Sequence, residues 1–331
     1  MAGTGKAHLR SDDVLLRVED LVVEFPVSGG RRLQAVSGIS FDVVKGETLG
    51  LVGETGCGKS STGRAIVQLT RPSSGSVDFA GAELTKLSGE ALRRTRAQLQ
   101  MIFQDPIASL NPRRKVEDIV AEGLKIWPER RSGAERSGLV DQVLRAVGLE
   151  PDAVSSRRPG QFSGGQCQRI SIARALVLDP SLLICDEPVS ALDVSVQAQI
   201  LNLLEDMKER YGLTMLFIAH DLAVIKNVSD RVVVMYLGKI CEVGRPDDLY
   251  ASPAHPYTQA LLAAIPQPDL DYQVVAQPLR GETPSPLDPP TGCRFRTRCP
   301  LAQKICEEQE PQIREVRPGH FAACHFAMSD A

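Results

Sequence analysis

GETGCGKSS, residues 53–61, is the stretch of sequence that decides the fold of this chain. It matches the pattern G-x-x-x-x-G-K-[ST], in which small residues let the backbone close around a chain of phosphates. The apolar run 48–52 before it predicts a buried strand, and residues 61–69 after it predict the start of a helix. Backbone amides and a helix N-terminus in this arrangement favour an anion. A chance glycine turn is the alternative, but it would not fill every position of the pattern.

The side chains of this loop predict how it would hold a nucleotide. Lys59 would reach the β- and γ-phosphates, and the hydroxyl of Ser60 would bind a magnesium ion. The rest of the loop would offer backbone amides to the phosphates. The candidate nucleotide-binding residues of the loop are Gly53, Glu54, Thr55, Gly56, Cys57, Gly58, Lys59, Ser60 and Ser61.

The overall composition narrows the class of protein. The chain has 331 residues, of which 43% are hydrophobic and 24% charged, and its net charge is −3. A near-neutral chain has no basic excess to neutralise phosphates, which argues against nucleic acid as the main partner. No apolar run approaches the roughly 18 residues of a membrane span, and the N-terminus lacks the apolar core of a secretory signal. We therefore expect a cytoplasmic protein that acts on membranes only through partner chains.

Short apolar runs and helical spacing predict an α/β domain followed by an appended tail. An edge strand is expected at 15–25, and turns or loops at 28–32 and 71–75. Residues 111 to about 148 have mostly helical spacing, whereas the proline-rich stretch 253–290 predicts an irregular connector. Further strands are predicted at 39–44, 75–79, 98–103, 182–185 and 215–219, with a hairpin formed by 232–236 and 239–243.

An apolar strand that ends in acid is the second feature typical of phosphate chemistry. Residues 182–188 read LLICDEP. Asp186 at the strand end would hold magnesium, directly or through water, and Glu187 would polarise an attacking water. An exposed acidic strand end is the alternative.

A second helix N-terminus suited to an anion follows the sequence FSGGQ at 162–166. Ser163 is a good N-cap, Gly164 and Gly165 leave the backbone open, and the residues after them have helical spacing as far as 178. A plain capped helix is the alternative for an isolated SGG. Its position about 20 residues before the acidic strand favours a role in binding.

Taken together, the motifs resemble those of the nucleotide-binding subunit of an ATP-binding cassette (ABC) transporter. GETGCGKS corresponds to the Walker A loop, FSGGQ to the signature and LLICDEP to the Walker B strand. SALD follows at 190–193, His220 ends the strand TMLFIAH, and Gln104 in MIFQDP matches the Q-loop. These six motifs occur in the family order over roughly residues 14–250. Phe162 stands where leucine is commonest in the signature, which is a mild departure. Cys167 replaces the usual charged residue after the signature and puts no catalytic role in doubt.

The resemblance implies the fold and the domains. The fold is an α/β P-loop ATP-binding cassette, with a RecA-like core, an antiparallel β subdomain and a helical signature subdomain at about 105–170. The cassette would span 1–252. A small cysteine-rich extension would span 253–331.

The resemblance also implies an active site shared by two chains that face head to tail. The signature residues of one chain would touch the γ-phosphate held by the Walker A loop of the other, with ATP and Mg²⁺ as cofactors. Phe25 is the candidate for stacking on adenine, and packing of Phe25 in the core is the alternative. For His220, the alternative is a histidine that packs in the core. In this scheme Glu187 is the catalytic base, and His220 positions the γ-phosphate and water. Lys59 holds the phosphates, and Gln104 links magnesium to the membrane subunits. Asp193 lies at the dimer interface, and the signature contact is formed by Ser163, Gly164, Gly165 and Gln166.

Three longer stretches resemble the oligopeptide and dipeptide importers within that family. They are MIFQDPIASLNP at 101–112, PVSALDVSVQAQ at 188–199 and HPYTQALLAAIP at 255–266. Within that group, VSALDVSVQAQ at 189–199 and GCGKSSTGRA at 56–65 resemble the "F" type of the two ATPase chains. The resemblance implies an ATP-hydrolysing subunit of an importer, peripheral on the cytoplasmic face of the membrane. Its partners would be a second, different cassette subunit, two transmembrane permease subunits and, through the complex, an extracytoplasmic solute-binding protein.

Other functions stay open at this point. Nickel, glutathione or a sugar could replace peptides as the solute. A soluble cassette ATPase of repair or translation is a second class, but such proteins carry tandem cassettes, long coiled-coil insertions or basic arms. An inactive regulatory partner is disfavoured because Lys59, Asp186, Glu187 and His220 are all present.

Four of the eight cysteines fall in the tail. Cys293, Cys299, Cys306 and Cys324 are separated by five, six and seventeen residues. Four thiolates can hold zinc or a [4Fe-4S] cluster, and the spacing lacks the two-residue gaps of zinc ribbons. The segment resembles the cysteine segment of peptide-importer ATPases, some of which hold an iron–sulfur cluster. We expect a [4Fe-4S] cluster, with zinc or no metal as alternatives.

Overall fold

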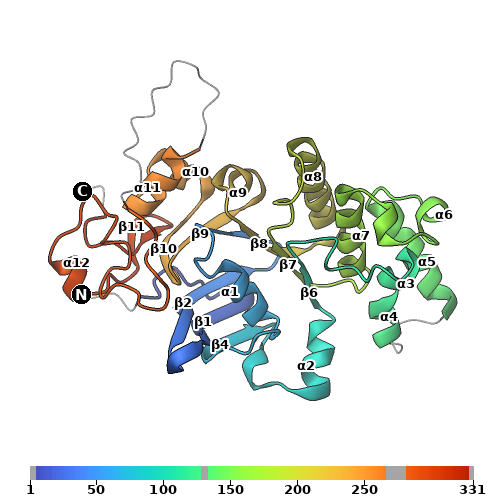
Figure 1. Ribbon diagram of the computed structural model, residues 1–331, viewed down its shortest axis with the longest axis horizontal. Helices are drawn as coiled ribbons and strands as arrows, with labels where there is room; N and C mark the ends of the chain where they lie inside the picture. The colour runs from blue at the N-terminus through green and yellow to red at the C-terminus, as the bar shows by residue number, and fades with distance from the viewer. Residues whose placement is uncertain (1–4, 128–132, 266–280, 328–331) are drawn as a thin grey trace, which may run out of the picture. The chain divides into compact units, whose positions relative to one another are not determined.

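A computed structural model of the chain describes residues 5–127, 133–265 and 281–327 (Figure 1). Two compact units make up the chain: the first contains Met1–Lys86 and Ile218–Ala331, and the second contains Leu87–Phe217. None of the helices in the described ranges is long and apolar enough to cross a membrane. The mixture of helices and sheets confirms the predicted α/β class.

A four-stranded antiparallel sheet forms one layer of the first unit. Its strand order is β2-β1-β4-β5, so β1 is an inner strand, and the prediction of an edge strand there was wrong. The alternation of buried residues along β1 changes phase at Asp20, which has a positive φ of 49° at a break in the register with β2. The strands are β1 (Val14–Pro26), β2 (Arg32–Val44), β4 (Ser74–Phe79) and β5 (Ala82–Glu83).

A second set of strands in the first unit carries the predicted phosphate loop. Strand β3 (Thr48–Val52) is completely buried and pairs in parallel with β9 (Arg231–Tyr236). Continuous apolar runs are typical of parallel strands that are covered on both faces. β9 and β10 (Lys239–Gly244) form the predicted hairpin across Leu237 and Gly238. The loop after β3 leads directly into α1 (Lys59–Ile66).

The C-terminal segment extends this set of strands. β12 (His320–Ala322) pairs with β10, and β11 (Arg314–Arg317) pairs with β12, both antiparallel (Figure 1). These two short strands were not predicted. The expectation of an irregular connector was wrong in part, because the described part of 253–290 begins with a helix, α11. The other helices of this unit are α9 (Leu222–Val228), α10 (Pro246–Ala251), α11 (Pro256–Ala263) and α12 (Ile305–Glu308).

The second unit is mainly helical, around one parallel strand pair. β6 (Leu99–Ile102) pairs with β7 (Leu182–Asp186), and β8 (Thr214–Ala219) begins in this unit and ends in the first. Helix α7 (Gly164–Leu176) contacts α3, α5, α8 and β6, so its buried face forms the centre of the unit (Figure 1). The remaining helices are α2 (Gly89–Arg96), α3 (Val116–Val120), α4 (Glu122–Ile126), α5 (Gly133–Ala146), α6 (Pro151–Val154) and α8 (Val194–Tyr211).

Candidate functional site

The loop between β3 and α1 closes tightly because glycines let other backbone segments approach it. A Cβ atom at Gly53 would lie 2.1 Å from the carbonyl oxygen of Met235. A Cβ atom at Gly58 would lie 2.2 Å from the carbonyl oxygen of Ala35, and the φ of Gly58 is 107°. Any larger side chain would therefore displace the loop from the strands that surround it.

Lys59 bridges this loop from inside. The side chain is buried, and its Nζ atom donates to the carbonyl oxygen of Gly53 at 2.7 Å and to that of Glu54 at 3.0 Å. The loop thus forms a ring that is closed by the Lys59 ammonium, which places a positive charge inside it. Gly58 is the N-cap of α1 and has no side chain to cap it, so the first amides of the helix suit the same anion.

Glu54 is fixed from outside the loop by the C-terminal segment, a feature that the sequence analysis missed. Its backbone N–H donates to the hydroxyl of Tyr257 at 2.9 Å. Its carboxylate accepts bonds from Arg298 at 2.9 and 3.1 Å and from Thr283 at 2.9 Å. These contacts join residues more than 200 positions apart, and no local sequence pattern predicts contacts at such a separation.

Two further candidates of the first unit are exposed. Phe25 lies at the end of β1 and is 36% exposed, so the alternative that it packs in the core was wrong. His220 directly follows β8 and is also exposed, so the alternative of a core histidine was wrong as well. Both side chains are therefore accessible to a ligand.

In the second unit, the carboxyl ends of β6 and β7 bring two predicted residues together. Gln104, two residues after β6, donates from Nε2 to Oε2 of Glu187 at 2.9 Å. Asp186 is the last residue of β7 and is fully buried. Glu187 follows it with a positive φ of 47°, a sparsely populated conformation that is found preferentially at functional sites.

The sequence FSGGQ begins α7 as predicted. Ser163 is the N-cap, and it forms a reciprocal capping box in which Gln166 N–H donates to the Ser163 hydroxyl and Ser163 N–H donates to the Gln166 amide oxygen. A Cβ atom at Gly165 would lie 2.6 Å from Val196, so this glycine allows α7 to approach α8. Asp193 is exposed at the N-cap of α8.

The four tail cysteines gather in the first unit. The backbone N–H of Cys293 donates to the carbonyl oxygen of Cys306 at 2.7 Å. Burial raises the pKa of Cys293 to about 11, and the thiols of Cys306, Cys324 and Cys299 act in the same direction because they are close. Burial also raises the pKa of Cys299 and of Cys324. The thiols of Cys293, Cys299 and Cys324 therefore favour the protonated form unless a metal displaces the protons.

Within the described residues, which include all four tail cysteines, no group of three or more His, Cys, Asp and Glu side chains is arranged to hold a metal ion. The thiols share one neighbourhood without converging on one point. The structure therefore does not show the expected [4Fe-4S] cluster or the alternative of a zinc ion.

Comparisons with known proteins agree with this geometry. The family model described as "ABC transporter" matches residues 36–190, and "Oligopeptide/dipeptide transporter, C-terminal region" matches residues 241–306. The chain is 50% identical to the oligopeptide transport ATP-binding protein OppF of Escherichia coli, over 94% of this chain and 96% of that protein. It is 48% identical to the oligopeptide transport ATP-binding protein AppF of Bacillus subtilis, over 96% of this chain and 98% of that protein.

The chain belongs to the oligopeptide and dipeptide importer group of the ABC transporter family. Its fold is that of an ABC ATPase cassette. A solved dimer of the ATP-binding cassette MJ0796, bound to ADP and Pi, matches with a TM-score of 0.63 and 26% identity, over 70% of this chain and 98% of that chain. The predictions of the family, the fold class and an ATP-hydrolysing transporter subunit are thereby confirmed.

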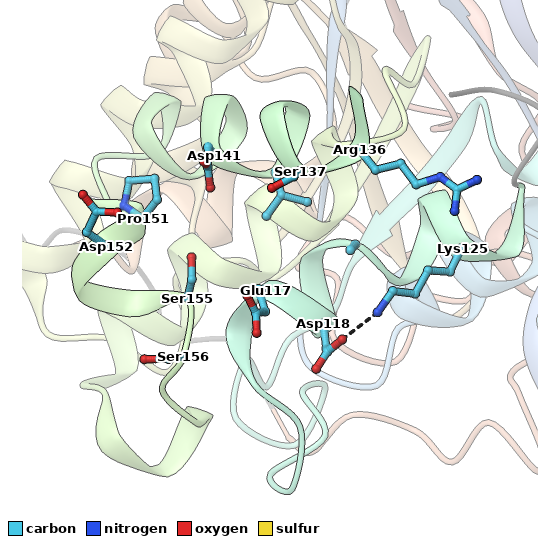
Figure 2. A pocket seen from close by; sticks show the side chains of 12 residues that line it. Glu117, Asp118, Lys125, Arg136, Ser137, Asp141, Pro151, Asp152, Ser155 and Ser156 are labelled. Atoms are coloured by element: carbon cyan, nitrogen blue, oxygen red, sulfur yellow. Dashed lines mark hydrogen bonds and ion pairs between the residues drawn. The ribbon is translucent and has the colours of Figure 1, made fainter. Parts of the chain in front are cut away.

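This ABC ATPase also has a polar hollow in its second unit, apart from the predicted site residues (Figure 2). It lies among α3, α5 and α6, where Lys125 forms an ion pair with Asp118 at 2.6 Å. Carboxylates and serines line most of it, together with Lys125 and Arg136, and no glycine lines it, so it differs from the glycine-rich loop 53–61. Of the described residues that line it, none is a predicted nucleotide-binding residue of the ABC ATPase.

Proposed function

We propose that this ABC ATPase powers the uptake of di- and oligopeptides, by binding and hydrolysing Mg²⁺–ATP at the loop 53–61. The observation that carries the proposal is the closed loop, with Lys59 held between the carbonyls of Gly53 and Glu54 at the uncapped start of α1. Peptides are proposed as cargo because the relatives OppF and AppF are described as oligopeptide transport proteins. Nickel, glutathione or a sugar would use the same ATP chemistry.

The proposed roles divide between phosphate binding and water activation. Lys59 binds the β- and γ-phosphates, while Ser60 and Asp186 hold Mg²⁺ with the help of Gln104. Glu187 is the general base, and its hydrogen bond to Gln104 at 2.9 Å supports a shared water or magnesium network. His220 positions the γ-phosphate, and Phe25 stacks on adenine. The signature Ser163–Gln166 and Asp193 act on the nucleotide of a second cassette.

The proposed assembly follows from that shared site. One cassette chain contains one loop of this type, so a second cassette subunit completes two sites, and we propose a heterodimer. Two transmembrane permease subunits would hold the pair at the cytoplasmic face of the membrane, and a solute-binding protein would deliver the cargo. We assign residues 1–252 to the cassette, with a helical part at about 105–170, and 253–331 to the extension.

We further propose that Cys293, Cys299, Cys306 and Cys324 hold a [4Fe-4S] cluster. Their shared neighbourhood supports it, and so do the raised pKa values of Cys293, Cys299 and Cys324, because a cluster would replace the protons of these thiols. When bound, such a cluster supplies a covalent clip and a redox centre. Iron and sulfide measured on protein purified without oxygen test the proposal: about four irons per chain are expected, whereas an iron-free chain with all thiols reactive would contradict it.

The ATPase assignment is tested with Glu187→Gln in the complete transporter in lipid vesicles. Loss of the base should lower ATP hydrolysis and peptide uptake at least about 100-fold, while ATP binding remains. Glu209→Gln, an exposed carboxamide substitution on α8, is the matched control and should hydrolyse ATP like the wild type. ATP hydrolysis by the Glu187→Gln variant at the wild-type rate would contradict the assignment of Glu187 as the general base. Normal ATP hydrolysis without peptide uptake would reject the cargo but not the ATPase.

A further inference from the structure

The peptide group between Gly53 and Glu54 is held from both sides. Its carbonyl oxygen, on Gly53, accepts the bond from Lys59 Nζ at 2.7 Å. Its N–H, on Glu54, donates to the Tyr257 hydroxyl at 2.9 Å. A trans peptide group is planar, and its N–H and C=O point in opposite directions. The bond to Tyr257 therefore fixes the direction of the carbonyl that binds Lys59.

Tyr257 is itself rigidly placed. It is fully buried in α11, where His255 caps the helix by accepting the Tyr257 N–H at 3.0 Å and Pro256 occupies the first turn. Its ring packs on Tyr236 with 4.7 Å between centroids and on Phe295 with 5.4 Å. The helix cap and the aromatic cluster leave the hydroxyl only one position.

Arg298 fixes the side chain of the same residue. Its NH1 group bonds both carboxylate oxygens of Glu54, and only 8% of the Arg298 side chain is exposed. Thr283 donates to the same carboxylate. The guanidinium lies 5.8 Å from the centre of the Tyr236 ring, which joins it to the aromatic cluster. A shielded, multiply bonded ion pair of this kind is stronger than an exposed one.

We propose that Tyr257 and Arg298 are positioning residues for the phosphate loop: they hold Glu54, and through the 53–54 peptide they hold Lys59. The proposal rests on the assignment of this loop to ATP. It gives the C-terminal segment a part in nucleotide affinity. With the Tyr257 hydroxyl absent, the 53–54 peptide can rotate, and Lys59 loses one of its two carbonyl partners. All of these contacts lie within the first unit.

The test uses Tyr257→Phe and Arg298→Gln in the full-length chain, assembled with its partner subunits in vesicles. Each variant should raise the KM for ATP about 3- to 10-fold, the effect of one or two lost hydrogen bonds, and leave kcat within about twofold. Arg298→Lys should recover part of the affinity, because an ammonium can still pair with Glu54. In a Glu54→Gln chain, Arg298→Gln should have little further effect, because its partner charge is already gone.

Matched controls separate positioning from folding. Tyr250→Phe removes a hydroxyl that has no hydrogen-bond partner among the described residues, and Arg296→Gln removes a neighbouring guanidinium that bonds only to Thr291 there. Both controls should leave the KM unchanged. A variant that lowers kcat at an unchanged KM would show fewer folded molecules and would overturn the proposal, as would an unchanged KM and kcat.

A further variant distinguishes two possible errors: that the loop 53–61 does not bind ATP, or that Tyr257 and Arg298 do not position it. Lys59→Ala should abolish ATP binding in the same assay. Wild-type affinity in Lys59→Ala would mean that the loop does not bind ATP, and the positioning proposal would fall with it. Loss of binding in Lys59→Ala combined with wild-type KM values in Tyr257→Phe and Arg298→Gln would overturn the positioning proposal alone.

Discussion

At the scale of single residues, a buried carboxylate joins the cassette to its C-terminal segment. Glu242 on β10 is fully buried and accepts bonds from the backbone N–H of Ala254 at 2.6 Å and of His255 at 2.9 Å. Nε2 of His320 lies 2.5 Å from the same carboxylate. A buried charge without such partners would be strongly destabilising, so these three contacts make the segment part of the core.

His255 makes the stability of this junction depend on pH. Burial lowers the pKa of His255 to about 4, against a smaller opposing effect of Glu242. Its unfolded pKa is about 6.5, so the unfolded chain binds more protons between the two values, and stability is lost as the pH falls from 6.5 towards 4. The loss between pH 7 and pH 5 should be about 2 kcal/mol in urea unfolding.

The matched variant for this prediction is His255→Asn. Asparagine can cap α11 in the same way but does not titrate. The variant should therefore lose about 2 kcal/mol less than the wild type over the same pH interval. Equal pH dependence of the two chains would assign the acid sensitivity to other groups.

Individual residues differ in how well the sequence alone can predict them. Lys59 and Ser163 are predictable because each depends on neighbours within a few residues, a loop in one case and a capping box in the other. Tyr257 is different, because its hydroxyl meets a backbone N–H 203 residues away. The HPY motif resembles that of the family, but no local sequence pattern predicts such a contact.

At the scale of elements, the N-terminus of α7 combines a structural and a binding role. Ser163→Ala removes the side-chain half of the capping box and should lower the free energy of unfolding by about 1 kcal/mol. If the proposed signature role holds, ATP hydrolysis should fall much further than this destabilisation explains. Thermal unfolding and ATPase activity measured on the same preparation compare the two effects.

Ser88 provides the control for that prediction. It is the N-cap of α2, and within the described residues its side chain accepts no capping bond. Ser88→Ala should therefore change neither stability nor hydrolysis measurably. A comparable loss of activity in Ser88→Ala and Ser163→Ala would remove the case for a specific signature role.

Apolar buried strands were predicted more reliably than polar ones. β3 was predicted with its observed ends, because five successive buried residues follow a charged turn and precede the glycine loop. β11 and β12 were missed because REVR and HFA are short and carry no apolar run, whereas the mostly apolar β6, which also has four residues, was predicted. The short helix α11 was hidden in a proline-rich stretch, although Pro256 at its first turn is a recognised start signal.

At the scale of the whole molecule, removal of the segment after residue 265 should be poorly tolerated. β10 would lose its partner β12 and become an open edge, and the Glu242 carboxylate would lose His320. The shortened chain should form oligomers or aggregates in size-exclusion chromatography with light scattering, whereas the full-length chain should not. Glu242→Gln removes the carboxylate that has lost its partner His320, so in the shortened chain this substitution should recover part of the soluble protein.

Motif order predicted the family, and the resemblance that rests on it places a helical part at about 105–170 inside the cassette. The first unit is built from two separate stretches, Met1–Lys86 and Ile218–Ala331, with the second unit inserted between them. Composition changes along the chain locate linkers between consecutive segments, so composition alone does not predict an insertion of this kind. Pairing such as β3 with β9 depends on the fold as a whole.

The contact between Arg298 and Glu54 sets an order of events during synthesis. The two residues are 244 positions apart, so the ribosome needs roughly 12 to 50 seconds to pass from one to the other at about 5–20 residues per second. During this time the loop has emerged without the groups that later hold it. A chain that has been synthesised only as far as residue 250 therefore holds the loop without Tyr257 and Arg298, and we expect it to bind ATP less tightly than a chain that contains both residues.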